Sequence, residues 1–393
     1  MRNVGETMRV TKKILIPGIT IAVMVAVRLI FAFGPGWYEA EPSLRLPDGD
    51  PGAGKLTLTG SACFRAAQQH RGTPCSEPKE AAADAPASER VHALLTRAVF
   101  DIDMLDTTKA LKETDAAITL DADSAQARHL ASRIAMTLGD LDRAEREVRI
   151  ALRLHPRDPH IGTTYAMLLL ARGATREAVG VLNDVISRSP DYLFARSQRA
   201  MFFAYLGQCC SRANYKVALD DYDFLIGRTP LDPVLFSQRA AIRLAIGQPE
   251  AAIEDLSAAL KLAPDRVDLM ISRADTYRAA GRDDLAVKDY DSILAEASPG
   301  VPLYIMPPDR SAKLLVARAQ SLVRLKRFTD AARDVVMAMT AGGKPAILRA
   351  QVFLRRHGYP DVPIDGENST KLRQALAACF GLDACYRPVM QAI

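Results

Sequence analysis

The sequence predicts an all-α chain whose central part is a solenoid of stacked helix pairs. Three observations support this fold class: long tracts dominated by alanine, an aromatic content of 6% with a single Trp, and glycines and prolines that recur alternately. A core built mostly of Ala and Leu brings helices close together. Apolar residues make up 49% and charged residues 25%, which argues against a disordered chain and a polytopic membrane protein. The net charge of +5 over 393 residues does not predict nucleic-acid binding.

The N-terminus has the pattern of a membrane anchor. Residues 1–13 carry four basic side chains and one acidic one, and residues 14–33 are almost continuously apolar. Twenty helical residues span about 30 Å, the thickness of a hydrocarbon core. The basic flank predicts a cytoplasmic N-terminus, a single pass through the inner membrane and most of the chain in the periplasm. A cleaved signal peptide remains the alternative, and both interpretations export everything after residue 34.

Residues 34–90 are rich in Pro, Gly and Ala and predict a periplasmic linker. Within the linker, residues 49–56 resemble a phosphate-binding loop. However, Leu56 stands where the motif needs a hydroxyl for Mg²⁺, and no strand pattern precedes it. We therefore expect no nucleotide site. The cysteines do not have the spacing of a metal site, so no metal and no other cofactor is expected either.

The six cysteines fit an exported protein. Cys63 and Cys75 bracket one short polar loop, and Cys379 and Cys385 bracket another, so each pair is a candidate disulfide in an oxidising compartment. The third pair consists of two adjacent residues, Cys209 and Cys210. Their Cα atoms are about 3.8 Å apart, below the usual disulfide range of about 4.4–6.8 Å, so this pair is expected to be free or strained.

Small residues and turn residues recur with a period of 34 in the centre of the chain. Prolines end each unit, an alanine lies twelve residues before each proline, and a second small residue lies upstream, with a glycine between the two. Gly accepts the left-handed conformation that ends a helix, and Pro stops the next helix, so the unit is helix, glycine turn, helix, proline turn. The core of the pattern is Pro156, Pro190, Pro230 and Pro264; Ala144, Ala178, Ala218 and Ala252; Ser132, Ala166, Ala200 and Ala240; and Gly139, Gly173, Gly207, Gly247 and Gly281.

These residues resemble the tetratricopeptide repeat family. Seven units cover residues 91–345, namely 91–124, 125–158, 159–192, 193–232, 233–266, 267–300 and 312–345. The fourth carries six extra residues in its turn, and the first and last have Leu105 and Lys326 in place of the turn glycine. The resemblance implies a right-handed superhelix whose concave face is lined by the first helix of each unit.

This concave face is the predicted binding surface for a protein or peptide. Its middle part is apolar, which suits an apolar or amphipathic peptide. The alternative, that these side chains pack against a neighbouring domain or the linker, stays open. The candidate residues are His129, Arg133, His160, Met167, Leu170, Phe194, Met201, Val234, Leu244 and Arg278.

Gly342-Gly343 marks a boundary, and residues 346–393 have a different sequence pattern from the repeats. A helical pattern with Ile347, Gln351 and Leu354 is followed by Gly358-Tyr359, by an Asp365-Gly366 turn and by a second helical pattern. These residues resemble the small three-helix peptidoglycan-binding module. The resemblance implies Tyr359, Asp365 and Gly366 as candidate glycan-binding residues. In the alternative, Asp365 and Gly366 only shape the turn, and the module is a docking cap.

Taken together, the sequence predicts a tetratricopeptide-repeat superhelix preceded by one transmembrane helix and followed by a peptidoglycan-binding-like module. The expected function is that of a bacterial envelope scaffold that binds protein partners and, through its C-terminal module, peptidoglycan. The alternative is an accessory subunit of an envelope assembly or secretion complex whose module has lost glycan binding. No catalytic motif has a supporting context, so an enzyme is not expected.

Overall fold

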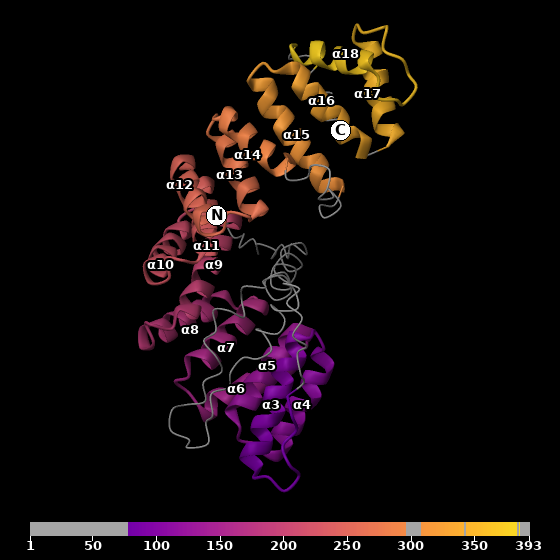
Figure 1. Cartoon of the computed structure of the whole chain (residues 1–393). Helices are drawn as coiled ribbons and strands as arrows, with labels where there is room; N and C mark the ends of the chain where they lie inside the picture. Colours follow the sequence, from indigo (N-terminus) through magenta and orange to yellow (C-terminus); the bar gives the residue numbers. More distant parts are fainter. Residues whose placement is uncertain (1–77, 296–307, 342, 383–384, 386–393) are drawn as a thin grey trace, which may run out of the picture. The chain divides into compact units, whose positions relative to one another are not determined.

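The computed structural model describes residues 78–295, 308–341, 343–382 and 385 (Figure 1). The predicted basic segment 1–13, the anchor 14–33 and most of the linker 34–90, with Cys63 and Cys75, lie outside these residues. Within the described part, no helix has both the length and the apolar character needed to cross a membrane.

The described residues form sixteen helices and no strand, which confirms the all-α prediction. Each predicted repeat contains two helices, and six of the pairs, from α3 with α4 to α15 with α16, pack directly against each other. The helices are α3 (Ala87–Asp103), α4 (Thr107–Leu120), α5 (Ala125–Leu138), α6 (Leu141–Leu154), α7 (Pro159–Ala171), α8 (Thr175–Arg188), α9 (Leu193–Cys209), α10 (Asn214–Arg228), α11 (Pro233–Ala245), α12 (Pro249–Leu262), α13 (Val267–Ala279), α14 (Asp283–Ala295), α15 (Pro308–Arg324), α16 (Phe328–Ala341), α17 (Lys344–Arg356) and α18 (Thr370–Phe380).

The chain divides into two compact units, Met1–Arg199 and Ala200–Ile393. The described part of the N-terminal unit holds α3 to α8 and the first residues of α9. The C-terminal unit holds the rest of α9 and α10 to α18. Each unit is described below by itself.

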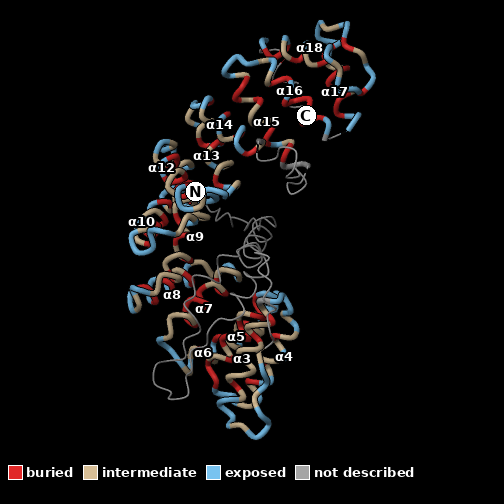
Figure 2. Tube along the Cα trace, viewed as in Figure 1, coloured by how far each residue is buried: buried red, intermediate tan, exposed pale blue. Residues whose placement is uncertain are grey.

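The recurring small residues lie where paired helices touch, as their spacing predicts. Ala144, Ala178, Ala218 and Ala252 are fully buried, and so are Ala166 and Ala200. Figure 2 shows the buried positions of the helices in red. In the second repeat, the Ser132 hydroxyl donates a 2.8 Å hydrogen bond to the carbonyl of Ala144, so the two small positions meet directly. The backbones approach closely at these points because the side chains are small, which explains why so few aromatic residues suffice for the core.

The left-handed turn is present even in repeats that lack its glycine. Gly139, with φ of 81°, ends α5 as predicted. Leu105 and Lys326 adopt φ of 64° and 61° at the corresponding positions of the first and last repeats. A side chain in this region costs about 1–2 kcal/mol. The outer repeats therefore keep the turn geometry at the expense of backbone strain.

Lys326→Gly is expected to raise the free energy of unfolding by about 0.5–1 kcal/mol, because glycine removes the strain at φ 61° and gives back part of the gain as chain entropy. Lys313→Gly, at an exposed position inside α15, is the control and should lower it by about 1 kcal/mol. Urea unfolding of both variants checks the pair. A loss of stability in Lys326→Gly would contradict this explanation.

Gly207 does not form the turn that its spacing predicts. It lies inside α9, which continues to Cys209, and it is buried. A Cβ atom at this position would lie 2.7 Å from Cγ of Tyr215 and closer still to two other ring atoms. Glycine is needed here because the Tyr215 ring packs on the helix backbone. The six extra residues lengthen the first helix of this repeat and move its turn beyond residue 209.

The last repeat and the C-terminal helices share one hydrophobic core. Buried residues of α15 and α16, such as Leu322 and Val335, belong to the same cluster as Leu354 of α17 and Leu376 of α18. This core crosses the predicted domain boundary at residue 345. The helices after the boundary therefore cover the open end of the last repeat.

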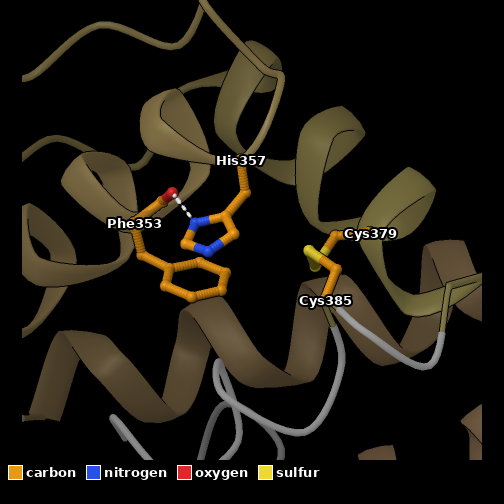
Figure 3. Close-up of a disulfide and its surroundings, with 4 residues drawn as sticks. All are labelled: Phe353, His357, Cys379 and Cys385. Carbon is orange, nitrogen blue, oxygen red and sulfur yellow. Dashed lines mark hydrogen bonds between the residues drawn. A yellow bond between two sulfur atoms is a disulfide. The ribbon is translucent and has the colours of Figure 1, made fainter.

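A disulfide joins Cys379 and Cys385, the pair that the sequence singles out near the C-terminus (Figure 3). Both residues are buried, and their Cα atoms are 5.2 Å apart, within the usual disulfide range. The bond ties Cys385 to Cys379 of α18 within the shared core.

Candidate protein-binding surface

Three successive first helices of the N-terminal unit contribute the histidines and aromatic residues of the predicted surface. Asp158 caps α7 by accepting hydrogen bonds from the backbone N–H groups of His160 and Ile161, which fixes the first turn that carries His160. His129 of α5 is buried, and its Nε2 shares a 2.7 Å hydrogen bond with Oγ1 of Thr164 on α7. The polar contact thus joins two adjacent repeats.

The row continues from α7 to the start of α9. Nδ1 of His160 and the hydroxyl of Tyr192 share a 3.0 Å hydrogen bond, and their rings meet edge to face with centroids 4.5 Å apart. The Tyr192 ring contacts Phe194 in the same way at 6.1 Å. The structure therefore links two predicted site residues, His160 and Phe194, through Tyr192, which the sequence analysis did not select.

His129 lies in an environment that excludes a positive charge. Burial is the main cause that holds its pKa well below the ordinary value of 6.5, and the nearby charges of Arg133 and His160 act in the same direction. These three predicted residues are thus within electrostatic reach of one another. His129 is neutral at physiological pH and serves as a hydrogen-bonding residue.

Acid is expected to destabilise the N-terminal unit through His129. Below pH 6.5 the unfolded chain binds a proton at this residue, whereas the folded chain resists protonation there. The free energy of unfolding therefore decreases as the pH is lowered, by up to about 1.4 kcal/mol per pH unit. Urea unfolding at pH 7.5 and 5.0 measures the loss. His129→Gln, which keeps a polar group near Thr164, should show a smaller loss, and an equal loss would contradict the assignment.

Gln198 is a site residue that the sequence analysis missed. It lies four residues after Phe194 and therefore on the same face of α9. Its side chain is 6% exposed, and its Nε2 has no hydrogen-bond partner among the described residues. A buried donor without an acceptor costs about 1–3 kcal/mol unless a partner supplies one. The spacing from Phe194 could have identified the position, but only the structure shows that the amide is unpaired.

Met167 and Leu170, also on α7, are half-buried and pack against the core formed by α5 to α8. Arg133 is half-buried on α5. Six of the ten predicted residues therefore lie in the N-terminal unit, on α5, α7 and α9.

The other four predicted residues lie in the C-terminal unit. Met201 is half-buried on α9, Val234 is 40% exposed in the first turn of α11, and Leu244 packs beside the core of α11 to α13. Arg278 of α13 donates a 2.5 Å hydrogen bond to Oε1 of Gln320 on α15, so it ties two repeats together. The continuous apolar stretch from Met167 to Leu244 covers both units and stays a prediction.

A ladder of arginine–carboxylate pairs also escaped the sequence analysis. In four repeats an Arg just before the packing alanine of the first helix binds an acidic residue sixteen positions later on the second helix. The pairs are Arg97–Glu113 (2.9 Å), Arg239–Asp255 (2.6 Å), Arg273–Asp289 (2.7 Å) and Arg318–Asp334 (2.7 Å). Aligning the repeats by their alanines would have exposed this pattern. Its role is to hold helices together.

The ladder also extends between repeats. Arg239 donates a second bond of 2.6 Å to Asp223 of the preceding repeat, and Arg318 does the same to Asp291. The carboxyl of Asp334 is buried, which raises its pKa, and the guanidinium of Arg318 opposes that change. These arginines are engaged within the solenoid and are not free for a ligand.

The candidate glycan-binding residues of the C-terminal helices make internal contacts. Gln351 is fully buried, and its Oε1 accepts hydrogen bonds from the backbone N–H groups of Asp365 (3.1 Å) and Gly366 (2.9 Å). Its Nε2 donates to Oδ1 of Asp365 at 2.8 Å. Tyr359 is half-buried against the shared core. These contacts shape the turn between α17 and α18.

The exposed ring of His357 and the half-buried ring of Phe353 lie together at the end of α17. His357 stacks on Phe353 with centroids 3.9 Å apart, and Nδ1 of His357 bonds the Phe353 carbonyl at 2.8 Å (Figure 3). Because Nδ1 donates to that carbonyl, Nε2 of a neutral His357 carries no proton. Phe353 also packs against the shared core.

Paired helices and buried small residues at each helix contact define a helical-repeat protein. A family profile described as tetratricopeptide repeat matches residues 129–192 and 238–302. The chain therefore contains tetratricopeptide repeats, as the residue pattern predicts.

One solved structure supports the fold, and two others show a weaker similarity. The C-terminal part of a TPR repeat-containing protein from Cytophaga hutchinsonii is 15% identical, with a TM-score of 0.50 over 61% of this chain and 93% of that chain. PilW, a type IV pilus biogenesis factor, is 17% identical, with a TM-score of 0.47 over 55% and 98%. YrrB, a TPR protein with an unusual peptide-binding site, is 19% identical, with a TM-score of 0.35 over 47% and 91%. At 15% identity the likeness to the Cytophaga hutchinsonii protein concerns the fold alone.

Proposed function

We propose that this chain is a membrane-anchored scaffold of the cell envelope that binds a protein or peptide through the first helices of its N-terminal unit. The observation that carries the proposal is Gln198. It lies on the same face of α9 as Phe194, and its buried amide has no hydrogen-bond acceptor among the described residues. A peptide carbonyl is an acceptor of the right kind for that donor. The neighbouring half-buried aromatic and methionine side chains supply apolar contact area.

Site-specific photo-cross-linking of the full chain in native membranes tests this surface. A benzophenone side chain replaces Phe194 in one variant and Gly180 in the other. Gly180 is the control because it lies exposed on the second helix α8, where an added Cβ meets no atom within 4 Å. We expect a discrete protein adduct from position 194 and none from position 180. Equal adducts from both positions, or none, would reject the proposed surface.

The anchor is the second part of the proposal and is supported by the basic flank before the apolar run 14–33. The full chain is expected to remain in membranes after alkaline carbonate extraction, whereas a variant without residues 14–33 should be released. A mature protein whose first residue lies after residue 34 would support the signal-peptide alternative instead.

The contacts of Asp365 and Gly366 favour a second candidate role for the C-terminal helices, namely that of a cap without glycan binding. Their backbone N–H groups are already bonded to Gln351, and Oδ1 of Asp365 accepts from Gln351 and from the N–H of Glu367. A chain with such a cap fits the accessory-subunit alternative.

Sedimentation with insoluble peptidoglycan distinguishes the cap from a wall-binding module. We expect the purified protein to stay in the supernatant. Co-sedimentation that Tyr359→Ala abolishes, without a change in thermal stability, would establish wall binding and reject the cap-only role.

A further inference from the structure

The turn of the fourth repeat carries two adjacent cysteines that the scaffold function does not use. Cys209 is the last residue of α9, and Cys210 follows in the turn. Both thiols are free and exposed, and their Sγ atoms are 2.6 Å apart. They lie in the six-residue insertion that the other repeats lack. The structure thus places two exposed thiols within reach of each other in this turn.

The C-terminal unit contains two cysteine pairs of opposite character. Cys379 and Cys385 are buried, with Cα atoms 5.2 Å apart, and form a disulfide with the spacing of a structural bond. Cys209 and Cys210 are exposed and adjacent, so their Cα atoms are about 3.8 Å apart, outside the usual range of about 4.4–6.8 Å. Strained or exposed disulfides are the more easily reduced ones. A bond at this position would therefore form and break reversibly.

We propose that Cys209 and Cys210 form a redox modification site that closes to a vicinal disulfide by exchange with a disulfide compound. The Cys210 thiolate attacks one sulfur of the compound and releases its other half as a thiolate. The Cys209 thiolate then attacks the sulfur of Cys210 and releases the second half. The pair loses two protons and two electrons, and the compound is reduced to two thiols.

The order of attack follows from the surroundings of Cys209. Partial burial and the hydrogen bond with Cys210 raise the pKa of the Cys209 thiol to about 11, although the hydrogen bond with Tyr205 acts in the opposite direction. Cys209 is thus protonated at neutral pH and reacts second, because only the thiolate is nucleophilic. Ring closure is expected to speed up as pH rises from 7 towards 10, since the thiolate fraction of Cys209 increases over that range.

Closure changes the end of α9. The carbonyl of Leu206 accepts 3.0 Å hydrogen bonds from the backbone N–H groups of both Cys210 and Ser211. Bonding the sulfurs distorts the peptide between the two cysteines, so these hydrogen bonds are weakened. The exposed peptide bond after Arg212 lies directly beyond them. The oxidised turn therefore becomes a better protease substrate than the reduced one.

Incubation of the purified full chain with glutathione disulfide tests the site. Exhaustive trypsin digestion releases residues 200–212, a peptide that contains only these two cysteines. We expect that peptide to lose two hydrogens by mass, to regain them in reduced glutathione while Cys379–Cys385 stays bonded, and to close faster at pH 9 than at pH 7. Limited trypsin digestion should cleave after Arg212 several-fold faster in the oxidised protein.

Cys209→Ser is the matched control, because it retains the attacking thiol and cannot close the ring. It should accumulate a glutathione adduct at Cys210 and show no faster cleavage after Arg212. In the unsubstituted chain, a peptide that keeps both thiols, one that carries only glutathione, or chains joined to one another would overturn the proposal. An internal bond with unchanged cleavage would overturn the proposed change at the end of α9.

Discussion

Asp255→Ala is expected to lower the free energy of unfolding of the C-terminal unit by about 3–5 kcal/mol. Asp255 is 3% exposed and accepts bonds of 3.0 and 2.6 Å from Nε and Nη2 of Arg239. Its second oxygen also lies 3.0 Å from Nη1 of Arg243. Removing the carboxylate leaves two largely buried guanidinium groups without their main counterion, which is among the costliest single changes in a folded protein.

Asp223, which belongs to the same ion network, provides the control for this substitution. Asp223 binds the other side of the Arg239 guanidinium at 2.6 Å, but its side chain is 56% exposed. Asp223→Ala should therefore cost at most about 1 kcal/mol. Urea unfolding of the two variants measures the difference. If Asp255→Ala lowered the free energy of unfolding by no more than about 1 kcal/mol, as Asp223→Ala should, the buried pairs of the ladder would contribute no more than ordinary surface pairs.

Leu354→Ala is expected to cost about 2–5 kcal/mol and to loosen the last repeat as well as the C-terminal helices. Leu354 is fully buried in the core that α15 and α16 share with α17 and α18. Truncation leaves a cavity that the surrounding helices only partly fill. Amide hydrogen exchange should therefore accelerate in α16 together with α17 and α18, in addition to a lower midpoint in urea.

Ile364→Ala is the matched control, because Ile364 is 48% exposed in the turn between α17 and α18. It should leave α16 protection unchanged and cost less than about 1 kcal/mol. If Leu354→Ala accelerates exchange only in α17 and α18, those helices form a separate domain, and their role as a cap is wrong.

The repeat register was predictable because it rests on side-chain size. Ala178 and Ala252 are small where two backbones meet, and a periodic requirement of this kind is visible in one sequence. The turn at Gly139 was predictable for a similar reason, since few residues other than glycine accept its backbone conformation. Side-chain size and backbone conformation both depend on the identity of the residue at that position, so they can be predicted from the sequence.

Other features depend on contacts between distant residues and were not predictable in the same way. Gly207 has the spacing of a turn glycine, but the ring of Tyr215 and the inserted residues determine its place inside α9. The shared core crosses the composition change at Gly342-Gly343 because packing does not follow composition. In the sequence, Gln198 has the pattern of an ordinary polar helix residue. Only the structure shows that its side chain is buried and that its amide has no acceptor among the described residues.

The candidate surface likewise combines features that the sequence predicts with features that depend on contacts between distant residues. Helical spacing placed His129, His160 and Phe194 on first helices, and the structure links the repeats that carry them through Thr164 and Tyr192. The sequence could not show that His129 is buried and neutral or that Arg278 is occupied by Gln320. Those properties depend on neighbours that lie more than thirty residues away along the chain.

The central claim is that the first-helix face of the N-terminal unit binds a protein partner, and Gln198→Met tests it most directly. Methionine keeps the length of the side chain and removes a donor that has no acceptor among the described residues, so stability in urea should be unchanged or higher. Affinity for the partner identified by cross-linking at position 194, measured by titration calorimetry, should fall about tenfold, the equivalent of one lost hydrogen bond. Unchanged affinity in a stably folded Gln198→Met chain would contradict the account.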